Sequence, residues 1–324
     1  MLVFVLATFA AWGLAVPPNV QAARTWTVIG GGGTRDLTVV LNAFYPRRLQ
    51  VATGDTVTWQ IEGFHNVAFL GGQKPPDLEI QEGGQTYFNP QVAFPAGGKT
   101  YDGTGYVNSG VSLDPSKPFS YSLTFTKAGS YGYLCLVHGP SMGGEIVVGD
   151  QTSGSPDSVL AAARQQQAAG VKAGQQAFAS LKPDWNGYTV NVPMIGSVKD
   201  GYSILRFTPR PIVVPRGATV RWSMADPFEI HTVTFTSGAK PPDHIIPQPQ
   251  QQGPPKLLVN PKATTPAGGK SYDGTGFVNS GILFPPGIPG NPPSSYSLTF
   301  TKAGTYEYVC IVHLPFMKGT VIVK

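Results

Sequence analysis

The sequence has few charged residues and no long basic segment. Only 13% of its 324 residues are Asp, Glu, Lys or Arg, and the formal net charge is +5. Nucleic-acid binding therefore has no support, because that function needs basic side chains clustered on one surface. The small positive excess favours at most an acidic surface on a protein partner.

Cysteine and histidine are also scarce, with two cysteines and five histidines in the whole chain. The two cysteines, Cys135 and Cys310, occupy equivalent positions in two similar halves of the sequence. A disulfide between them would require the two surrounding loops to face each other at bonding distance. We therefore expect two free thiols.

One long apolar segment occurs, at the N-terminus. Residues 1–16 are nearly all apolar, and two prolines and a small-residue cleavage site ending at Ala22 follow them. The segment is too short to span a bilayer comfortably, so it predicts a secretory signal peptide over residues 1–22. We expect an exported protein, periplasmic or extracellular. No basic residue precedes the segment, which leaves retention as an anchor as the alternative.

The chain contains an internal repeat. SYSLTFTKAGSY at residues 120–131 recurs as SYSLTFTKAGTY at 295–306, and GGKTYDGTGYVNSG at 97–110 recurs as GGKSYDGTGFVNSG at 268–281. Tyr121, Leu123 and Phe125 alternate with polar residues, the period of a half-buried strand. With 40 glycines and 31 prolines as turn formers, the sequence predicts an all-β protein of two sandwich domains.

The segment between the repeats has a different composition. Residues 151–184 are rich in Ala and Gln, Ser155 and Pro156 are typical of a helix start, and Pro183 ends the segment. We predict a linker helix packed on a domain, with a partner-binding helix as the weaker alternative. The predicted division is therefore a first domain at 23–150, this linker at 151–184 and a second domain at 185–324.

Each half carries the pattern Cys-x2-His-x3-Met, preceded at long range by one more histidine. A thiolate, two imidazoles and a weakly bound thioether form the ligand set of a mononuclear blue-copper site. Zinc is less well suited, because a methionine ligand favours copper. The sequence thus predicts two type 1 copper sites, one formed by His65, Cys135, His138 and Met142 and the other by His231, Cys310, His313 and Met317.

These residues resemble the cupredoxin family, the plastocyanin-like and azurin-like blue type 1 copper proteins, in a tandem two-domain form. FHNVAF around His65 and EIHTVTF around His231 match the family's first ligand, and YLCLVHGPSM and YVCIVHLPFM match its ligand loop. The resemblance implies two Greek-key β-sandwiches joined by the helical linker. It also implies that His138 and His313 expose one ring edge in an apolar surface patch where a redox partner docks.

The resemblance implies an electron carrier that exchanges electrons with a redox protein such as a cytochrome or an oxidase, and that meets a membrane surface only through such a partner. Copper storage or delivery is the alternative. A copper oxidase or nitrite reductase, which also uses paired cupredoxin domains, needs further histidine ligands, and only His244 remains unassigned. We therefore do not expect an enzyme.

Weaker patterns complete the set of expectations. The glycine-lysine pairs near residues 98 and 269 lack the first glycine of a phosphate-binding loop. Asp102 and Asp273 are expected in turns rather than calcium sites, because few carboxylates surround them. His244 is expected on an exposed loop, and the repeated YDGTG(Y/F)VNSG segment is expected to be an added loop. The more apolar second ligand loop predicts a higher reduction potential for the second site.

Overall fold

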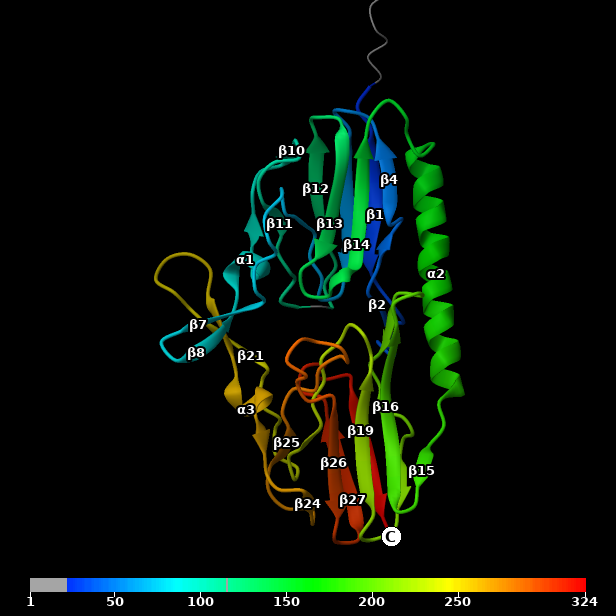
Figure 1. The fold of residues 1–324 in the computed structure, drawn as a ribbon, viewed down its shortest axis with the longest axis vertical. Helices are drawn as coiled ribbons and strands as arrows, with labels where there is room; N and C mark the ends of the chain where they lie inside the picture. Colours follow the sequence, from blue (N-terminus) through cyan, green and yellow to red (C-terminus); the bar gives the residue numbers. More distant parts are fainter. Residues whose placement is uncertain (1–21, 115) are drawn as a thin grey trace, which may run out of the picture.

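The computed structural model describes residues 22–114 and 116–324. Two β-sandwiches lie end to end, with one long helix beside them (Figure 1). The predicted signal peptide lies outside the described residues apart from its last residue, Ala22. Within the described ranges, none of the helices combines the length and apolarity needed to cross a membrane.

The first half, residues 22–150, contains two sheets. The five-stranded sheet has the order β10 (Thr100–Tyr101), β12 (Phe119–Phe125), β5 (Thr56–Glu62), β1 (Thr25–Gly31), β3 (Phe44–Tyr45). The six-stranded sheet has the order β4 (Arg48–Val51), β14 (Gly139–Val148), β13 (Gly129–Cys135), β6 (Ala68–Phe69), β11 (Val107–Ser109), β9 (Pro95–Ala96). Side chains from both sheets, including Trp59 and Ile146, form one buried core. The predicted alternation is confirmed in β12, where Leu123 and Phe125 are buried and Ser120 and Ser122 are exposed.

The second half, residues 184–324, repeats this arrangement. One sheet has the order β2 (Val39–Leu41), β17 (Tyr202–Ile204), β16 (Thr189–Ser197), β19 (Thr219–Ala225), β26 (Ser295–Phe300), β24 (Ser271–Tyr272), with β15 (Asp184–Asn186) paired to β16. The other has the order β18 (Ile212–Val214), β28 (Lys318–Val323), β27 (Gly304–Val309), β20 (Thr234–Phe235), β25 (Val278–Ser280), β23 (Pro266–Ala267). Equivalent strands take equivalent places in both six-stranded sheets, so the sequence repeat is also a repeat of the fold. The all-β class with two sandwiches is confirmed.

Two strand pairings connect the halves. β2 comes from the first half but pairs with β17 of the second, with Leu41 opposite Tyr202. A separate four-stranded sheet has the order β21 (Ile245–Gln248), β22 (Lys256–Val259), β8 (Gln85–Phe88), β7 (Glu79–Glu82). It joins a hairpin of each half through β8 and β22 (Figure 1). The two sandwiches are therefore tied together by backbone hydrogen bonds at two places.

Each half also carries one of these hairpins and a short helix after it, α1 (Pro90–Ala93) and α3 (Pro261–Thr264). The prediction that the YDGTG(Y/F)VNSG segment is a loop was wrong for its two ends, since Tyr101 belongs to β10 and Val107–Ser109 forms β11, while residues 102–106 between them lie outside strands. Tyr101 and Tyr272 of that segment are buried in the two cores, and β10, β11 and their counterparts are strands of the sandwiches. Aromatic burial and strand pairing place the segment inside the fold.

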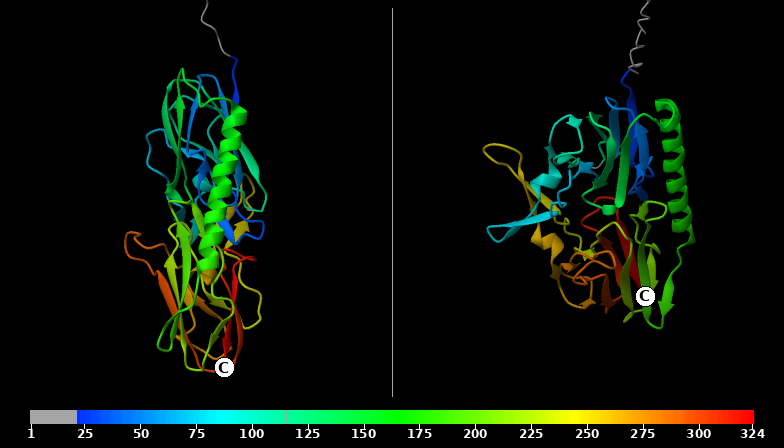
Figure 2. Two further views of the ribbon diagram at one scale, coloured as in Figure 1. Left: turned by 90° about the vertical axis from the view of Figure 1, so that its right-hand side faces the viewer. Right: turned by 45° about the horizontal axis from the view of Figure 1, so that its top comes forward.

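The helix α2 (Pro156–Ser180) confirms the predicted helical segment, with Ser155 as its N-cap. It packs along both halves (Figure 2), because its apolar face shares one cluster with residues of each. That cluster includes Ala163 and Phe178 of the helix, Val39 of β2 and Tyr202 of β17. The helix thus links the halves along the chain and also packs against both of them at their junction.

Candidate metal centres

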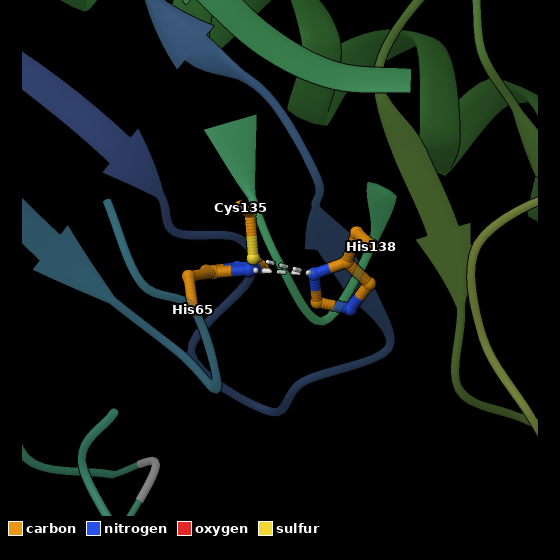
Figure 3. Close-up of side chains that lie close together, drawn as sticks. All are labelled: His65, Cys135 and His138. Carbon is orange, nitrogen blue, oxygen red and sulfur yellow. Dashed lines mark hydrogen bonds between the residues drawn. The ribbon is translucent and has the colours of Figure 1, made fainter. Parts of the chain in front are cut away.

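The first candidate centre lies at the end of the first sandwich that faces the second. His65 lies between β5 and β6, Cys135 ends β13, and His138 lies in the short loop before β14. The His65 and His138 Nδ1 atoms are 3.0 Å apart, and the Cys135 Sγ lies 3.4 Å from the His138 Nδ1 (Figure 3). Two imidazole nitrogens and one sulfur therefore converge on a single point.

The second centre repeats this geometry. The His231 and His313 Nδ1 atoms are 3.2 Å apart, and the Cys310 Sγ lies 3.8 Å from His231 Nδ1 and 3.4 Å from His313 Nδ1. Donor atoms that share one metal ion at ordinary N and S bond lengths stand about 3.0–4.0 Å apart over the usual range of bond angles. The separations in both groups fit a bound metal.

Local structure aims these side chains. The register of β13 against β14 shifts between Leu134 and Cys135, and such a bulge redirects the side chain that follows it. Gly31 leaves room for the His65 ring, since a Cβ there would lie 2.4 Å from the ring's Cδ2. Its φ of +76° also suits glycine.

The repeated VNSG sequence supports the backbone beside the first histidine of each candidate centre. Ser109 Oγ accepts a hydrogen bond from the Val67 N–H, two residues after His65, at 2.9 Å. Ser280 Oγ accepts the equivalent bond from the Val233 N–H at 2.8 Å. Asn108 donates to carbonyl oxygens of α1 and so ties that short helix to the same strand. This repeated sequence is thus a scaffold for the centres.

The charges inside the first centre suit a soft cation. Burial alone would raise the pKa of Cys135, but the nearby His138 charge and hydrogen bonds from both histidines lower it to about 5. Burial likewise would lower the pKa of His138, but Cys135 and Glu229 raise it to about 10. Both shifts are in the direction that favours a thiolate beside an imidazolium when no metal is bound. A binding metal ion therefore displaces a proton.

The two predicted methionines are fully buried. Met142 belongs to the same core cluster as Cys135, and Met317 to the same cluster as Cys310. The Cys310 N–H donates to the Met317 carbonyl at 2.9 Å. Both thioethers therefore lie in the interior, Met142 within β14 and Met317 directly before β28. Both cysteines are free, so the expectation of no disulfide is confirmed.

The residue after the first histidine differs between the centres. The Asn66 side chain accepts from the Leu136 N–H at 2.7 Å, and the Thr232 hydroxyl accepts from the Ile311 N–H at 2.8 Å. In addition, the Thr232 backbone N–H donates to the Cys310 sulfur at 3.3 Å. Within residues 22–114 and 116–324, no matching bond from Asn66 to Cys135 is found. The two thiolates therefore have different hydrogen bonding.

The prediction that His138 and His313 expose a ring edge was wrong. Their side chains are 3% and 12% exposed, and both point into the junction between the sandwiches. His138 Nε2 lies 3.4 Å from Oε1 of Glu229, and His313 Nε2 lies 3.2 Å from Oε2 of the same carboxylate. The two sandwiches meet at their ligand ends, which covers these edges.

Sequence reasoning did not identify Glu229 or its neighbour Asp226. The Asp226 carboxylate accepts bonds from the N–H groups of Phe228 and Glu229 and from the Ser203 hydroxyl, which shapes the turn before His231. Eight residues separate Trp222 from His231, whereas five separate Trp59 from His65. The segment before His231 is thus three residues longer and contains two acidic residues. This difference between the halves could have pointed to Asp226 and Glu229.

The remaining singled-out residues take simpler roles. Asp102 and Asp273 each accept bonds from a threonine two residues later, so the predicted turns are confirmed. His244 lies in a loop directly before β21, as expected, but it is half-buried rather than exposed. Burial first, and then the His313 charge, lower its pKa to about 4. Packing of the β21–β22 hairpin between the halves accounts for the difference.

Comparison with known proteins finds a family match at the C-terminal end of the second half. The sequence profile of the copper-binding proteins, plastocyanin/azurin family, matches residues 290–324, which include Cys310, His313 and Met317. Amicyanin from Paracoccus denitrificans is 63% identical to the chain over 30 residues, which are 9% of this chain. In that match the chain spans 22% of the length of the curated relative.

Solved structures of amicyanin also match less than half of this chain. An oxidised variant of amicyanin corresponds to 45% of this chain and 94% of its own, with 21% identity and a TM-score of 0.24. Amicyanin from Paracoccus versutus corresponds to 44% of this chain and 92% of its own, with 21% identity and a TM-score of 0.23.

Proposed function

We propose that this chain, which belongs to the plastocyanin/azurin family of copper-binding proteins, is an exported electron carrier with one type 1 copper site in each half. The observation that carries the proposal is the convergence, twice, of two imidazole nitrogens and one cysteine sulfur. We assign His65, Cys135, His138 and Met142 to one site. His231, Cys310, His313 and Met317 form the other.

Bound copper would supply a one-electron couple between Cu(I) and Cu(II), since the soft sulfur suits the former and the imidazoles suit both. The protein's own contribution is a rigid, dry ligand cage. Cys135 and Cys310 are fully buried, and strands of both sheets hold the surrounding core. Because the ligands have little freedom to move, the change of oxidation state requires little rearrangement.

Copper storage or delivery remains the alternative function. Delivery favours open sites from which the metal leaves readily, whereas His65 and His231 are 3% and 0% exposed. The burial of these ligands supports the carrier. An oxidase or nitrite reductase would need further histidines, and His244 is the single one left outside the two groups.

We assign one copper site to each predicted domain, 23–150 and 185–324, with the linker at 151–184. We propose a periplasmic or extracellular location and a redox protein partner such as a cytochrome or an oxidase. Because the loop histidines are covered, such a partner exchanges electrons at another part of the surface near one of the centres.

Copper analysis and the visible spectrum of the purified mature protein test this function. We expect two copper ions per chain and an intense blue colour in the oxidised form, from thiolate-to-copper charge transfer. Stopped-flow mixing with a cytochrome and with a copper chelator separates carrier from delivery protein. Fast electron exchange with slow copper loss supports the carrier, and the reverse supports delivery. A colourless protein that binds no copper contradicts both.

A further inference from the structure

One carboxylate lies between the two candidate centres. Glu229 faces the outer nitrogen of His138 with one oxygen and that of His313 with the other, at 3.4 and 3.2 Å. Only 13% of the Glu229 side chain is exposed. A continuous chain of three side chains, imidazole, carboxylate and imidazole, therefore joins a proposed ligand of one site to a proposed ligand of the other.

The chemistry of the two rings explains why this position holds a glutamate. In each ring Nδ1 faces the cysteine sulfur, so a metal there leaves the proton on Nε2. Two N–H donors then point at one residue, and a carboxylate has an acceptor oxygen for each. A glutamine in the same place has one acceptor and one donor group, so it satisfies only one ring.

The surrounding structure fixes this carboxylate. Asn42, directly after β2, donates from Nδ2 to Glu229 Oε1 at 3.3 Å and to Ser203 of β17 at 2.9 Å. Ser203 in turn donates to Asp226, whose carboxylate shapes the turn that carries Glu229. The strand pairing that joins the halves thus also positions the bridging residue.

We propose that Glu229 is the bridge of an internal electron relay, in which electrons pass between the two sites through His138, Glu229 and His313. The proposal rests on the proposed function. One electron leaves Cu(I) at one site, which becomes Cu(II), and reduces Cu(II) at the other to Cu(I), so no proton or further reactant is consumed. Tunnelling falls steeply with the width of a gap, and the bridge divides the space between the rings into two hydrogen-bond-length contacts. The chain is then a two-centre carrier in which one site accepts the electron and the other releases it.

The relay is tested by the rate of transfer between the sites after a sub-stoichiometric flash reduction. The background carries Met142→Gln, because a change of axial ligand alters the colour and potential of the first site and makes the two distinguishable. We expect a rate constant that does not depend on protein concentration. Glu229→Ala should lower it at least tenfold and Glu229→Gln several-fold. Glu307→Gln, which removes an exposed carboxylate of the second half, should leave it unchanged.

A second readout follows the bridge without electron transfer. In the reduced, diamagnetic protein, the Nε2 protons of His138 and His313 should be protected from exchange with solvent, and NMR should show this protection lost in Glu229→Ala. Small-angle scattering reports whether the halves stay together. If Glu229→Ala separates them, the isosteric Glu229→Gln variant decides the matter.

The outcomes distinguish the two proposals. An unchanged transfer rate in both Glu229 variants, with copper bound, overturns the relay while the carrier function stands. A rate that rises with protein concentration also overturns it, since transfer would then occur between molecules. Absence of copper and colour in the parent protein overturns the proposed function itself, before any rate is measured.

Discussion

At the scale of single residues, the two cysteines have the most direct chemical consequence. Each is fully buried, and each sulfur lies 3.4 Å from the Nδ1 atom of the histidine three residues later. Serine has nearly the same shape but is a poor ligand for copper, so it removes the sulfur while disturbing the packing little. The cysteines therefore allow each site to be deleted separately.

Cys135→Ser should abolish the first site and Cys310→Ser the second. Each variant should bind one copper ion and keep about half of the blue absorbance, because thiolate-to-copper charge transfer causes the colour. Copper analysis and absorption spectroscopy measure both. An unchanged spectrum in one variant would exclude that cysteine as a ligand, and the double variant is the colourless control.

Hydrogen bonding to the sulfur predicts a difference in potential. The Thr232 N–H donates to the Cys310 sulfur, which reduces the electron density that the thiolate gives to copper and favours Cu(I). A hydrogen bond of about 1 kcal/mol corresponds to about 40 mV for a one-electron couple. We expect the Cys310 site to have the higher potential, so that electrons flow from the first half to the second. Potentiometric titration of the two single-site variants measures this, and a higher value at the Cys135 site would contradict it.

At the scale of elements, the helix α2 depends on small residues at its contact face. Gly170 and Gly174 are its buried glycines, and a Cβ at Gly174 would lie 2.4 Å from a Val39 methyl group. Glycine normally weakens a helix interior, so its presence here reflects the close approach of β2. The contact holds the strand that crosses between the halves.

Gly174→Leu should therefore destabilise the protein. Overpacking a tight contact typically costs about 1–3 kcal/mol. Ala169→Leu adds the same side chain at an exposed position of the same helix and should change stability little. Chemical denaturation of both variants gives the two free energies of unfolding. Equal values would show that α2 does not press on β2 as the structure indicates.

At the scale of the whole molecule, the two halves share structure rather than merely a linker. β2 pairs with β17, β8 pairs with β22, and α2 contacts both halves. Arg206 of the second half also reaches the Asp36 turn of the first at 3.5 Å. Unfolding one half would expose strand edges and apolar surface of the other.

We expect the metal-free protein to unfold in a single transition despite its two cores. Calorimetry should give equal calorimetric and van't Hoff enthalpies, the test of a two-state process. Copper should raise the transition temperature of the whole protein, because it binds the folded state. The Cys135→Ser variant is the control, in which copper at the second site alone should still shift one common transition. Two separate transitions would show that the halves are independent.

The sequence by itself determined the repeat, the strands of each half, the helix after Ser155 and the members of the two His-Cys-His groups. These depend on local patterns, such as the alternation in β12 and the short spacing from Cys135 to His138, and on the chemistry of the residue types. Cys135 and His138 lie close together at the end of β13 whatever packs around that strand. Such features follow from residues close together in the chain.

Only the tertiary structure decided how the two halves meet. The pairing of β2 with β17 and the two contacts of Glu229 join residues from 84 to 165 positions apart, such as Glu229 with His313 and Val39 with Ile204. Strand edges and buried charges choose partners by shape and complementarity, which no local pattern encodes. The family resemblance implied exposed rings at His138 and His313, whereas the meeting of the two halves directs both rings toward one carboxylate.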